Sequence, residues 1–201
     1  MPVRAVIFDM DGTITKPYFD WPRMKAAMGL PQNRPILESL EALAPDARRR
    51  CEAQLLAFED EAADRSELNV GTRDALSFLK RRGILTAILT RNSARSVERV
   101  LERHGLAFDT VVTRHCAPPK PAPDAVFLIA ERLGSADDPI PPERMVMVGD
   151  YEYDIIAGQR AGTHTILVTN GEPNDFATPA DVEIATLADL PAAIEQIERD
   201  A

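Results

Sequence analysis

The chain has 201 residues, and its 32 acidic and 23 basic side chains give a formal net charge of −9. This acidic balance, with no basic block, disfavours nucleic acid and anionic membrane surfaces as partners. We expect a soluble, cytoplasmic protein, because there is no secretory leader or membrane-length apolar run and the two cysteines, Cys51 and Cys116, suggest no disulfide framework.

The first predicted element is a buried strand at residues 3–8, an apolar run broken only by Arg4. It leads into Asp9-Met10-Asp11-Gly12, which places two carboxylates just past the strand end, where open α/β sheets bind ligands. Gly12 can adopt a positive φ, and the free amides of such a turn can hold a phosphate. A lone Asp-x-Asp-Gly segment is more often an ordinary solvated turn, so this motif needs support from the rest of the chain.

Residues 17–68 show helical spacing and no convincing strand, with helices expected near residues 24–30, near residues 36–43 and after Pro45. From residue 72 onward, predicted helices alternate with predicted strands. The helices lie at residues 72–82, 93–104, 124–133, 154–161 and 190–197, and the strands at 84–89, 110–113, 145–148, 165–168 and 182–184. This alternation predicts an α/β fold in which residues 1–15 and 69–201 form a doubly wound parallel, Rossmann-like sheet and residues 16–68 form a small all-helical insertion.

Four successive strand ends carry polar side chains, and these ends meet along one edge of a parallel sheet. They hold Asp9 and Asp11, then Thr90-Arg91-Asn92, then Lys120 among prolines, and finally Asp150 to Asp154. Each group also has an ordinary explanation: Thr90 can cap the next helix, Lys120 can be a solvated surface lysine, and Asp150 and Asp154 can be a helix cap and a first-turn acid. Because all four groups occur together, the sequence predicts an active site.

At these positions the sequence resembles the haloacid dehalogenase-like (HAD) hydrolases. The resemblance rests on Asp9-Met-Asp11-Gly-Thr-Ile, on Thr90, on Lys120 in Lys-Pro-Ala-Pro-Asp, and on Gly149-Asp150 through Asp154. It covers essentially the whole chain. The helical insertion is similar to the cap domain of the phosphoglycolate phosphatase and β-phosphoglucomutase branch.

The resemblance implies phosphoryl transfer through an aspartyl-phosphate intermediate. Asp9 is the expected nucleophile, and Asp11 the expected acid and base. We expect Mg²⁺ to bind Asp9, the backbone carbonyl of Asp11 and Asp150, with Asp154 orienting a water molecule or Lys120. Lys120 is expected against the phosphate and Asp9, and Thr90 is expected to donate a hydrogen bond to the phosphate.

The expected activity is Mg²⁺-dependent hydrolysis of a small phosphorylated metabolite, phosphoglycolate-like or a sugar phosphate, by a monomer. A β-phosphoglucomutase-like phosphomutase and a non-catalytic binding protein are the alternatives. The candidate substrate-binding residues are Gly12, Arg91 and Asn92 beside the motifs and Tyr18, Trp21 and Arg23 in the cap. An arginine there would favour a second anionic group on the substrate. These cap residues fit equally well as two aromatic side chains of the cap core and an exposed arginine.

Overall fold

The computed structural model describes residues 1–135 and 137–200; positions 136 and 201, which fall in the predicted core domain, lie outside the described residues. The chain divides into two compact units. Residues 1–17, 67–92 and those from 106 onward form the first, and residues 18–66 and 93–105 form the second. The second unit thus contains most of the predicted insertion together with residues 93–105, whereas the boundaries of a functional cap domain stay a prediction.

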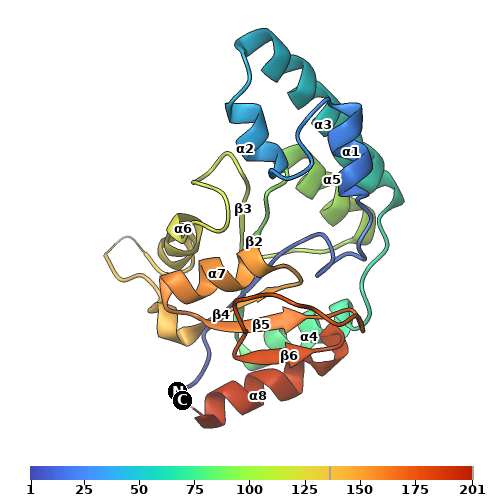
Figure 1. Ribbon diagram of the computed structural model, residues 1–201. Coiled ribbons are helices and arrows are strands. Elements are labelled where there is room, and N and C mark those ends of the chain that lie inside the picture. The colour runs from blue at the N-terminus through green and yellow to red at the C-terminus, as the bar shows by residue number, and fades with distance from the viewer. Residues whose placement is uncertain (136, 201) are drawn as a thin grey trace. The chain divides into compact units, whose positions relative to one another are not determined.

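The first unit is built on a fully parallel sheet. Its strands are β1 (Ala5–Phe8), β2 (Leu85–Leu89), β3 (Thr110–Val112), β4 (Met145–Gly149), β5 (His164–Val168) and β6 (Val182–Ile184), in the spatial order β3-β2-β1-β4-β5-β6 (Figure 1). The predicted doubly wound parallel sheet is confirmed. The chain adds β2 and β3 on one side of β1 and then crosses back to add β4, β5 and β6 on the other.

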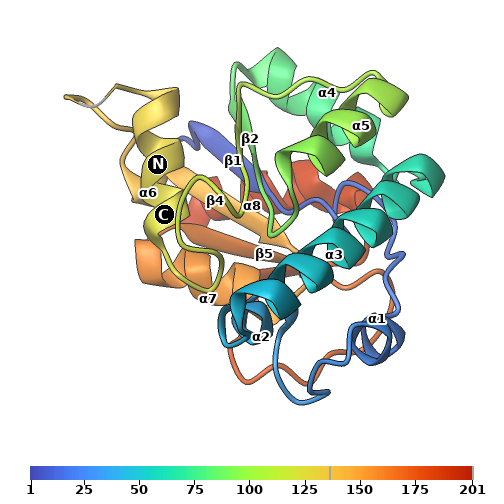
Figure 2. The same ribbon diagram turned by 90° about the horizontal axis from the view of Figure 1, so that it is seen from above.

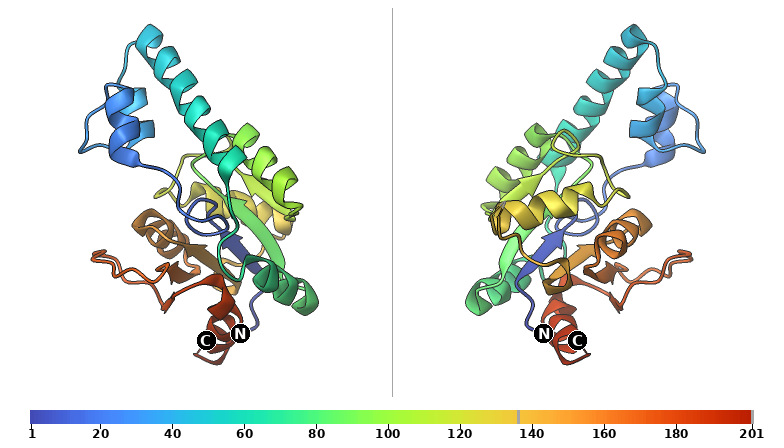
Figure 3. Two further views of the ribbon diagram at one scale, coloured as in Figure 1. Left: turned by 90° about the vertical axis from the view of Figure 1, so that its right-hand side faces the viewer. Right: turned by 90° about the vertical axis from the view of Figure 1, so that its left-hand side faces the viewer.

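Helices cover both faces of this sheet (Figure 3). On one face, Val6 and Phe8 pack with side chains of α4 (Thr72–Arg82) and α8 (Leu190–Asp200). On the other, Ala5 and Ile7 pack with α6 (Asp124–Leu133) and α7 (Glu152–Ala161). Burial on both faces explains why the strands are continuous apolar runs rather than alternating ones. Two short 3₁₀ helices, η1 (Pro142–Arg144) and η2 (Leu187–Asp189), complete the unit.

The second unit contains α1 (Trp21–Ala27), α2 (Ile36–Glu41), α3 (Pro45–Arg65) and α5 (Ala94–His104). Its apolar core is small and includes Met24, Met28, Ile36 and Leu55. Helices α3 and α5 lie side by side (Figure 2). Buried Glu59 on α3 accepts hydrogen bonds from the backbone N–H (3.2 Å) and the hydroxyl (2.6 Å) of Ser93, which caps α5.

Most predicted helix ends are confirmed, because Gly83, Gly105 and Gly162 all follow a helix with positive φ. Two helix starts differ from the prediction: α5 begins at Ala94, one residue later than predicted, and α7 begins at Glu152 rather than at Asp154. The reason at α7 is local, since the Asp154 carboxylate accepts the N–H of Tyr151 (3.1 Å) and so closes an earlier first turn; at α5, Ser93 is the cap rather than the first helical residue. Among the helices of the described segments, none has both the length and the apolar composition required to cross a bilayer.

Candidate active site

The site lies where the sheet reverses its strand order, between β1 and β4. These two strands pair in parallel with Phe8 opposite Val148, and the N–H of Asp9 donates to the carbonyl of Val148 (2.9 Å). Asp9 therefore leaves β1 beside the end of β4, which leads into Asp150. A crevice at the carboxyl ends of strands flanking such a reversal is the usual ligand site of an open α/β sheet.

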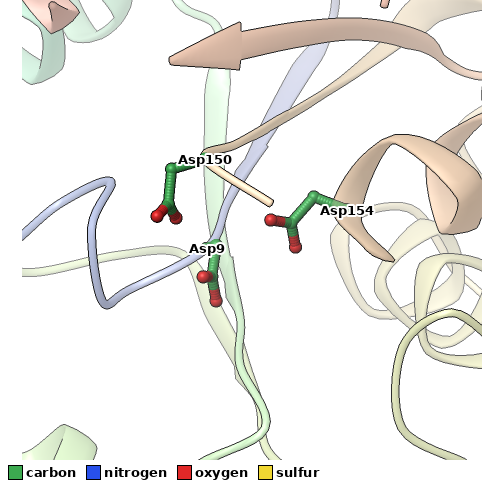
Figure 4. A group of neighbouring side chains, drawn as sticks. All are labelled: Asp9, Asp150 and Asp154. Atoms are coloured by element: carbon green, nitrogen blue, oxygen red, sulfur yellow. The ribbon is translucent and has the colours of Figure 1, made fainter. Parts of the chain in front are cut away.

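Three carboxylates lie close together at this edge (Figure 4). Oxygens of Asp9, Asp150 and Asp154 all lie within 4.8 Å of one another. Asp9 follows β1, Asp150 follows β4, and Asp154 lies in the first turn of α7. Hard carboxylate oxygens grouped at this distance fit a divalent cation such as Mg²⁺.

The environment of this acidic cluster disfavours charge on Asp150 and Asp154. Burial raises the pKa of Asp150 well above its ordinary value, and the charges of Asp9 and Asp154 raise it further. Burial also raises the pKa of Asp154, to about 6, although Lys120 opposes the shift. A bound cation would reverse both shifts because it stabilises the ionised carboxylates.

Lys120 brings a positive charge of the protein into contact with this cluster. Its side chain is only 2% exposed, so the interpretation as a solvated surface lysine was wrong. The ammonium contacts Asp9 Oδ1 (2.7 Å), Asp154 Oδ1 (2.5 Å) and the backbone carbonyl of Leu89 (2.8 Å). Burial lowers the pKa of Lys120, but the charges of Asp154 and Asp9 outweigh it and the net shift is upward. These three contacts use all the ammonium hydrogens, so a phosphate would have to replace one of them.

The turn after β1 packs directly against Asp150. Gly12 has φ +80°, and a Cβ added there would lie 2.0 Å from Asp150 Oδ2. The hydroxyl of Thr13 donates to Asp150 Oδ1 (3.1 Å). The sequence interpretation gave Thr13 no role, although it belongs to the first motif. Only glycine, with its positive φ and absent side chain, fits the position of Gly12.

Asp11 lies in the same turn, and its Oδ2 accepts a hydrogen bond from the side-chain amide of Asn92 (2.6 Å). This amide belongs to a predicted substrate-binding residue, and that role stays a prediction; the contact shown is with the expected acid and base. Asn92 follows β2 by way of Thr90 and Arg91. The end of β2 thereby supports the turn after β1.

Thr90 does not cap a helix as one alternative proposed, because the cap of α5 is Ser93, whose side chain accepts the N–H of Ser96. The buried Thr90 hydroxyl accepts the N–H of Asn92 (3.1 Å), which leaves the hydrogen of the hydroxyl available for donation.

The predicted cap role of Asp150 is also wrong, since Tyr151 occupies the cap position of α7. Arg91 donates to the backbone carbonyl of Lys120 and lies 5.4 Å from the Tyr153 ring centroid.

The cap candidates belong to the second unit and stay predictions as substrate contacts. Tyr18 and Trp21 are 40% and 48% exposed, so the alternative that made them core aromatics was wrong. The Tyr18 hydroxyl donates to Glu61 (3.1 Å), and Arg23 is exposed. The surface rings of this segment pack mainly on one another, as Phe19 and Trp21 do with centroids 4.8 Å apart.

Comparison with known proteins agrees with this geometry. A family model described as haloacid dehalogenase-like hydrolase matches residues 3–162, which include every motif residue above. A Saccharomyces cerevisiae protein named an uncharacterized hydrolase is 31% identical over 99% of this chain and 94% of its own length. The N-acetylmuramic acid 6-phosphate phosphatase of Pseudomonas aeruginosa is 27% identical over 95% of this chain and 92% of its own.

Among solved structures, the crystal structure of a predicted phosphoglycolate phosphatase from Haemophilus somnus superposes with a TM-score of 0.73 at 19% identity, covering 95% of this chain and 97% of that one. At that identity the likeness shows a common fold. The family match itself rests on residues 3–162 and on the relatives that align over nearly the full chain. The resemblance predicted from the motifs is thereby confirmed, and the chain is an enzyme of the haloacid dehalogenase-like hydrolase family.

Proposed function

We propose that this hydrolase is a Mg²⁺-dependent phosphomonoesterase that uses Asp9 as its nucleophile and acts on a small phosphate ester. The observation that carries the proposal is the state of the Asp9 carboxylate. Lys120 holds its Oδ1, while Oδ2 accepts no hydrogen bond from the described residues. A carboxylate fixed at one oxygen and open at the other is prepared for in-line attack.

In the first step the open oxygen of Asp9 attacks phosphorus, and the bond from phosphorus to the ester oxygen breaks. Asp11 donates a proton to the departing alkoxide. In the second step Asp11 takes a proton from water, which attacks phosphorus and releases inorganic phosphate with Asp9 restored. The hydrogen bond from Asn92 to Asp11 supports this role, because it fixes the orientation of the carboxylate through both steps.

Mg²⁺ would be held by Asp9 and Asp150 together with the backbone carbonyl of Asp11. When bound, it supplies positive charge that stabilises the charge on the transferring phosphoryl group. Asp154 is engaged by Lys120 and by the N–H of Tyr151, which supports an orienting role for it rather than a direct one. Thr90 then donates its hydroxyl hydrogen to a phosphate oxygen.

We propose that the substrate is a phosphorylated sugar or a small phosphorylated acid. The assignment is supported by the P. aeruginosa relative, which is named as a phosphatase of N-acetylmuramic acid 6-phosphate. An exposed arginine in the predicted cap, Arg23, agrees with a substrate that bears a second negative charge.

The test is phosphate release from a panel of esters with and without Mg²⁺. The panel contains phosphoglycolate, hexose 1- and 6-phosphates and N-acetylmuramic acid 6-phosphate, and Asp9→Asn is assayed beside the wild type. We expect release that requires both Mg²⁺ and Asp9, and faster turnover of the carboxylated esters. Equal activity of wild type and Asp9→Asn would overturn the proposal. Conversion of hexose 1-phosphate to hexose 6-phosphate without phosphate release would show a phosphomutase instead.

A further inference from the structure

Two side-chain amides from distant parts of the first unit meet on one backbone carbonyl of the nucleophile turn. Asn69, in the segment that precedes α4, donates from Nδ2 to the carbonyl of Gly12 (3.0 Å). Asn170, which follows β5, donates from its own Nδ2 to the same carbonyl (2.8 Å). The two asparagines also bond to each other, from Asn69 Nδ2 to Asn170 Oδ1 (2.7 Å).

This arrangement satisfies its donors and acceptors in only one orientation of each amide. Asn69 Oδ1 accepts the N–H of Val70 (2.9 Å), so Nδ2 is the atom that faces Gly12 and Asn170. Both Asn69 amide hydrogens are used, and the Gly12 carbonyl uses both of its lone pairs. If the Asn69 amide were reversed, its oxygen would face the Gly12 carbonyl oxygen and Asn170 Oδ1, and neither can donate a hydrogen bond. Asn69 is only 7% exposed, so breaking the network would leave a nearly buried amide unpaired.

The carbonyl that the asparagines hold lies between two functional groups of the site. On one side of Gly12 the chain carries Asp11, the proposed acid and base. On the other side it carries Thr13, which donates to Asp150 (3.1 Å). Gly12 itself packs against the Asp150 carboxylate. A displacement of this peptide would therefore move the acid and the proposed Mg²⁺ ligand together.

We infer that Asn69 and Asn170 are positioning residues for catalysis, acting as a clamp on the Gly12 carbonyl that sets the places of Asp11 and Asp150. The inference rests on the proposed function, since it assumes that those two carboxylates serve phosphoryl transfer and Mg²⁺ binding. Neither asparagine belongs to the four sequence motifs.

A purely structural role for Asn170 is the competing explanation, and the chain offers a variant that separates the two. Asn170 and Gly171 both have positive φ, 55° and 81°, and the N–H of Glu172 donates to the carbonyl of Thr169 (3.0 Å). This is the geometry of a type I′ turn, for which Asn-Gly is a favoured pair. Glycine at position 170 keeps the turn conformation but removes the side-chain amide, so Asn170→Gly removes one of the two donors of the clamp and spares the turn.

The experiment measures kcat, KM, the Mg²⁺ concentration for half-maximal activity and the melting temperature of Asn170→Gly with the best ester of the panel. We expect kcat to fall about tenfold or more and the Mg²⁺ requirement to rise several-fold, with little change in the melting temperature. The control is Asn174→Gly in the same loop, and it should match the wild type. Among the described residues, the exposed side chain of Asn174 bonds only to the N–H of Phe176, which it accepts. A binding readout accompanies the kinetics: the rise in melting temperature caused by Mg²⁺ should be smaller in Asn170→Gly than in the wild type.

Asn170→Asp gives a second route if the glycine variant folds poorly, because aspartate also suits the turn but cannot donate to Gly12. Unchanged kcat and unchanged Mg²⁺ requirement in either folded variant would overturn the inference, as would a loss of activity fully explained by unfolding. The fold loss of activity in the double variant Asn69→Ala/Asn170→Gly should be far smaller than the product of the fold losses of the two single variants. The two amides bond to each other and to the same carbonyl, so they act as one unit. A wild type that neither releases phosphate nor is stabilised by Mg²⁺ would refute the proposed function, and that result is distinct from failure of the clamp alone.

Discussion

Replacing Lys120 with methionine tests the electrostatics of the site most severely. The substitution keeps a long unbranched side chain but removes an ammonium that is 2% exposed and contacts two carboxylates and one carbonyl. Asp154, itself nearly inaccessible, would then either be ionised without its cation or have to take up a proton, and each costs stability near neutral pH. Removing one partner of a buried ion pair typically costs about 3–5 kcal/mol, so we expect Lys120→Met to lower the free energy of unfolding by that amount near neutral pH.

The loss should depend on pH in a definite direction. Asp154 has a pKa of about 6 even beside Lys120, so it takes up a proton in mildly acidic solution and then no longer needs the ammonium. At about pH 5 the destabilisation should shrink to the lost hydrogen bonds, about 1–2 kcal/mol. Mg²⁺ should recover part of the stability near neutral pH because it supplies the missing positive charge.

Urea unfolding monitored by circular dichroism, without divalent cations and at both pH values, measures this effect. Lys16→Met is the matched control, since Lys16 makes an equally short contact with Glu67 (2.6 Å) but both side chains are more than half exposed. That variant should unfold like the wild type at both pH values. A Lys120→Met protein as stable as the wild type, or one destabilised equally at both pH values, would refute the reasoning.

Three further predictions concern the same structure. Gly12→Ala should lower activity about 100-fold or more, because the added Cβ would lie 2.0 Å from a carboxylate oxygen of Asp150. The control is Gly83→Ala, since Gly83 also has a positive φ but no atom lies within 4 Å of the added Cβ. This variant should share the backbone strain and keep full activity in the phosphate assay. Glu59→Ala should lower the free energy of unfolding by about 1–3 kcal/mol, because the N–H and the hydroxyl of Ser93 at the start of α5 lose their acceptor. Glu59→Gln should lose less stability. Equal urea midpoints for the wild type and both variants would contradict this prediction. Without divalent cations, the wild type should lose stability relative to Asp154→Asn as the pH rises from about 4 to about 6, because the folded protein holds the Asp154 proton more tightly than the unfolded chain; a difference that is flat or increases in this window would be inconsistent with the raised pKa.

The sequence predicted those features of the fold that depend on local signals. The parallel sheet followed from continuous apolar runs, and helix ends followed from glycines such as Gly83 and Gly105. The meeting of Asp9 with Asp150 was also accessible, because parallel strands place their ends along one edge and the motifs mark those ends. Boundaries were less certain, as at α7, where a side chain of the first turn moves the helix start.

The features that escaped prediction depend on contacts between distant residues. Nothing near Asn170 in the sequence indicates that its amide reaches Gly12, 158 residues away. The grouping of α5 with the helical insertion rests on pairs such as Glu59 with Ser93, 34 residues apart. The exposure of Trp21 was equally hidden, since an aromatic residue beside apolar neighbours gives the same local pattern whether it is buried or at the surface.

The central claim is that Asp9 carries the phosphoryl group, and trapping the intermediate tests it most directly. Asp11→Asn removes the base that activates water while leaving Asp9 and Lys120 in place, and an activated aryl phosphate needs no acid to release its phenol. After brief reaction with Mg²⁺, acid quenching and peptide mass spectrometry should find a phosphoryl group on Asp9. An Asp11→Asn protein that releases phenol with no phosphoryl group on Asp9, beside an Asp9→Asn variant that still hydrolyses the ester, would contradict the account.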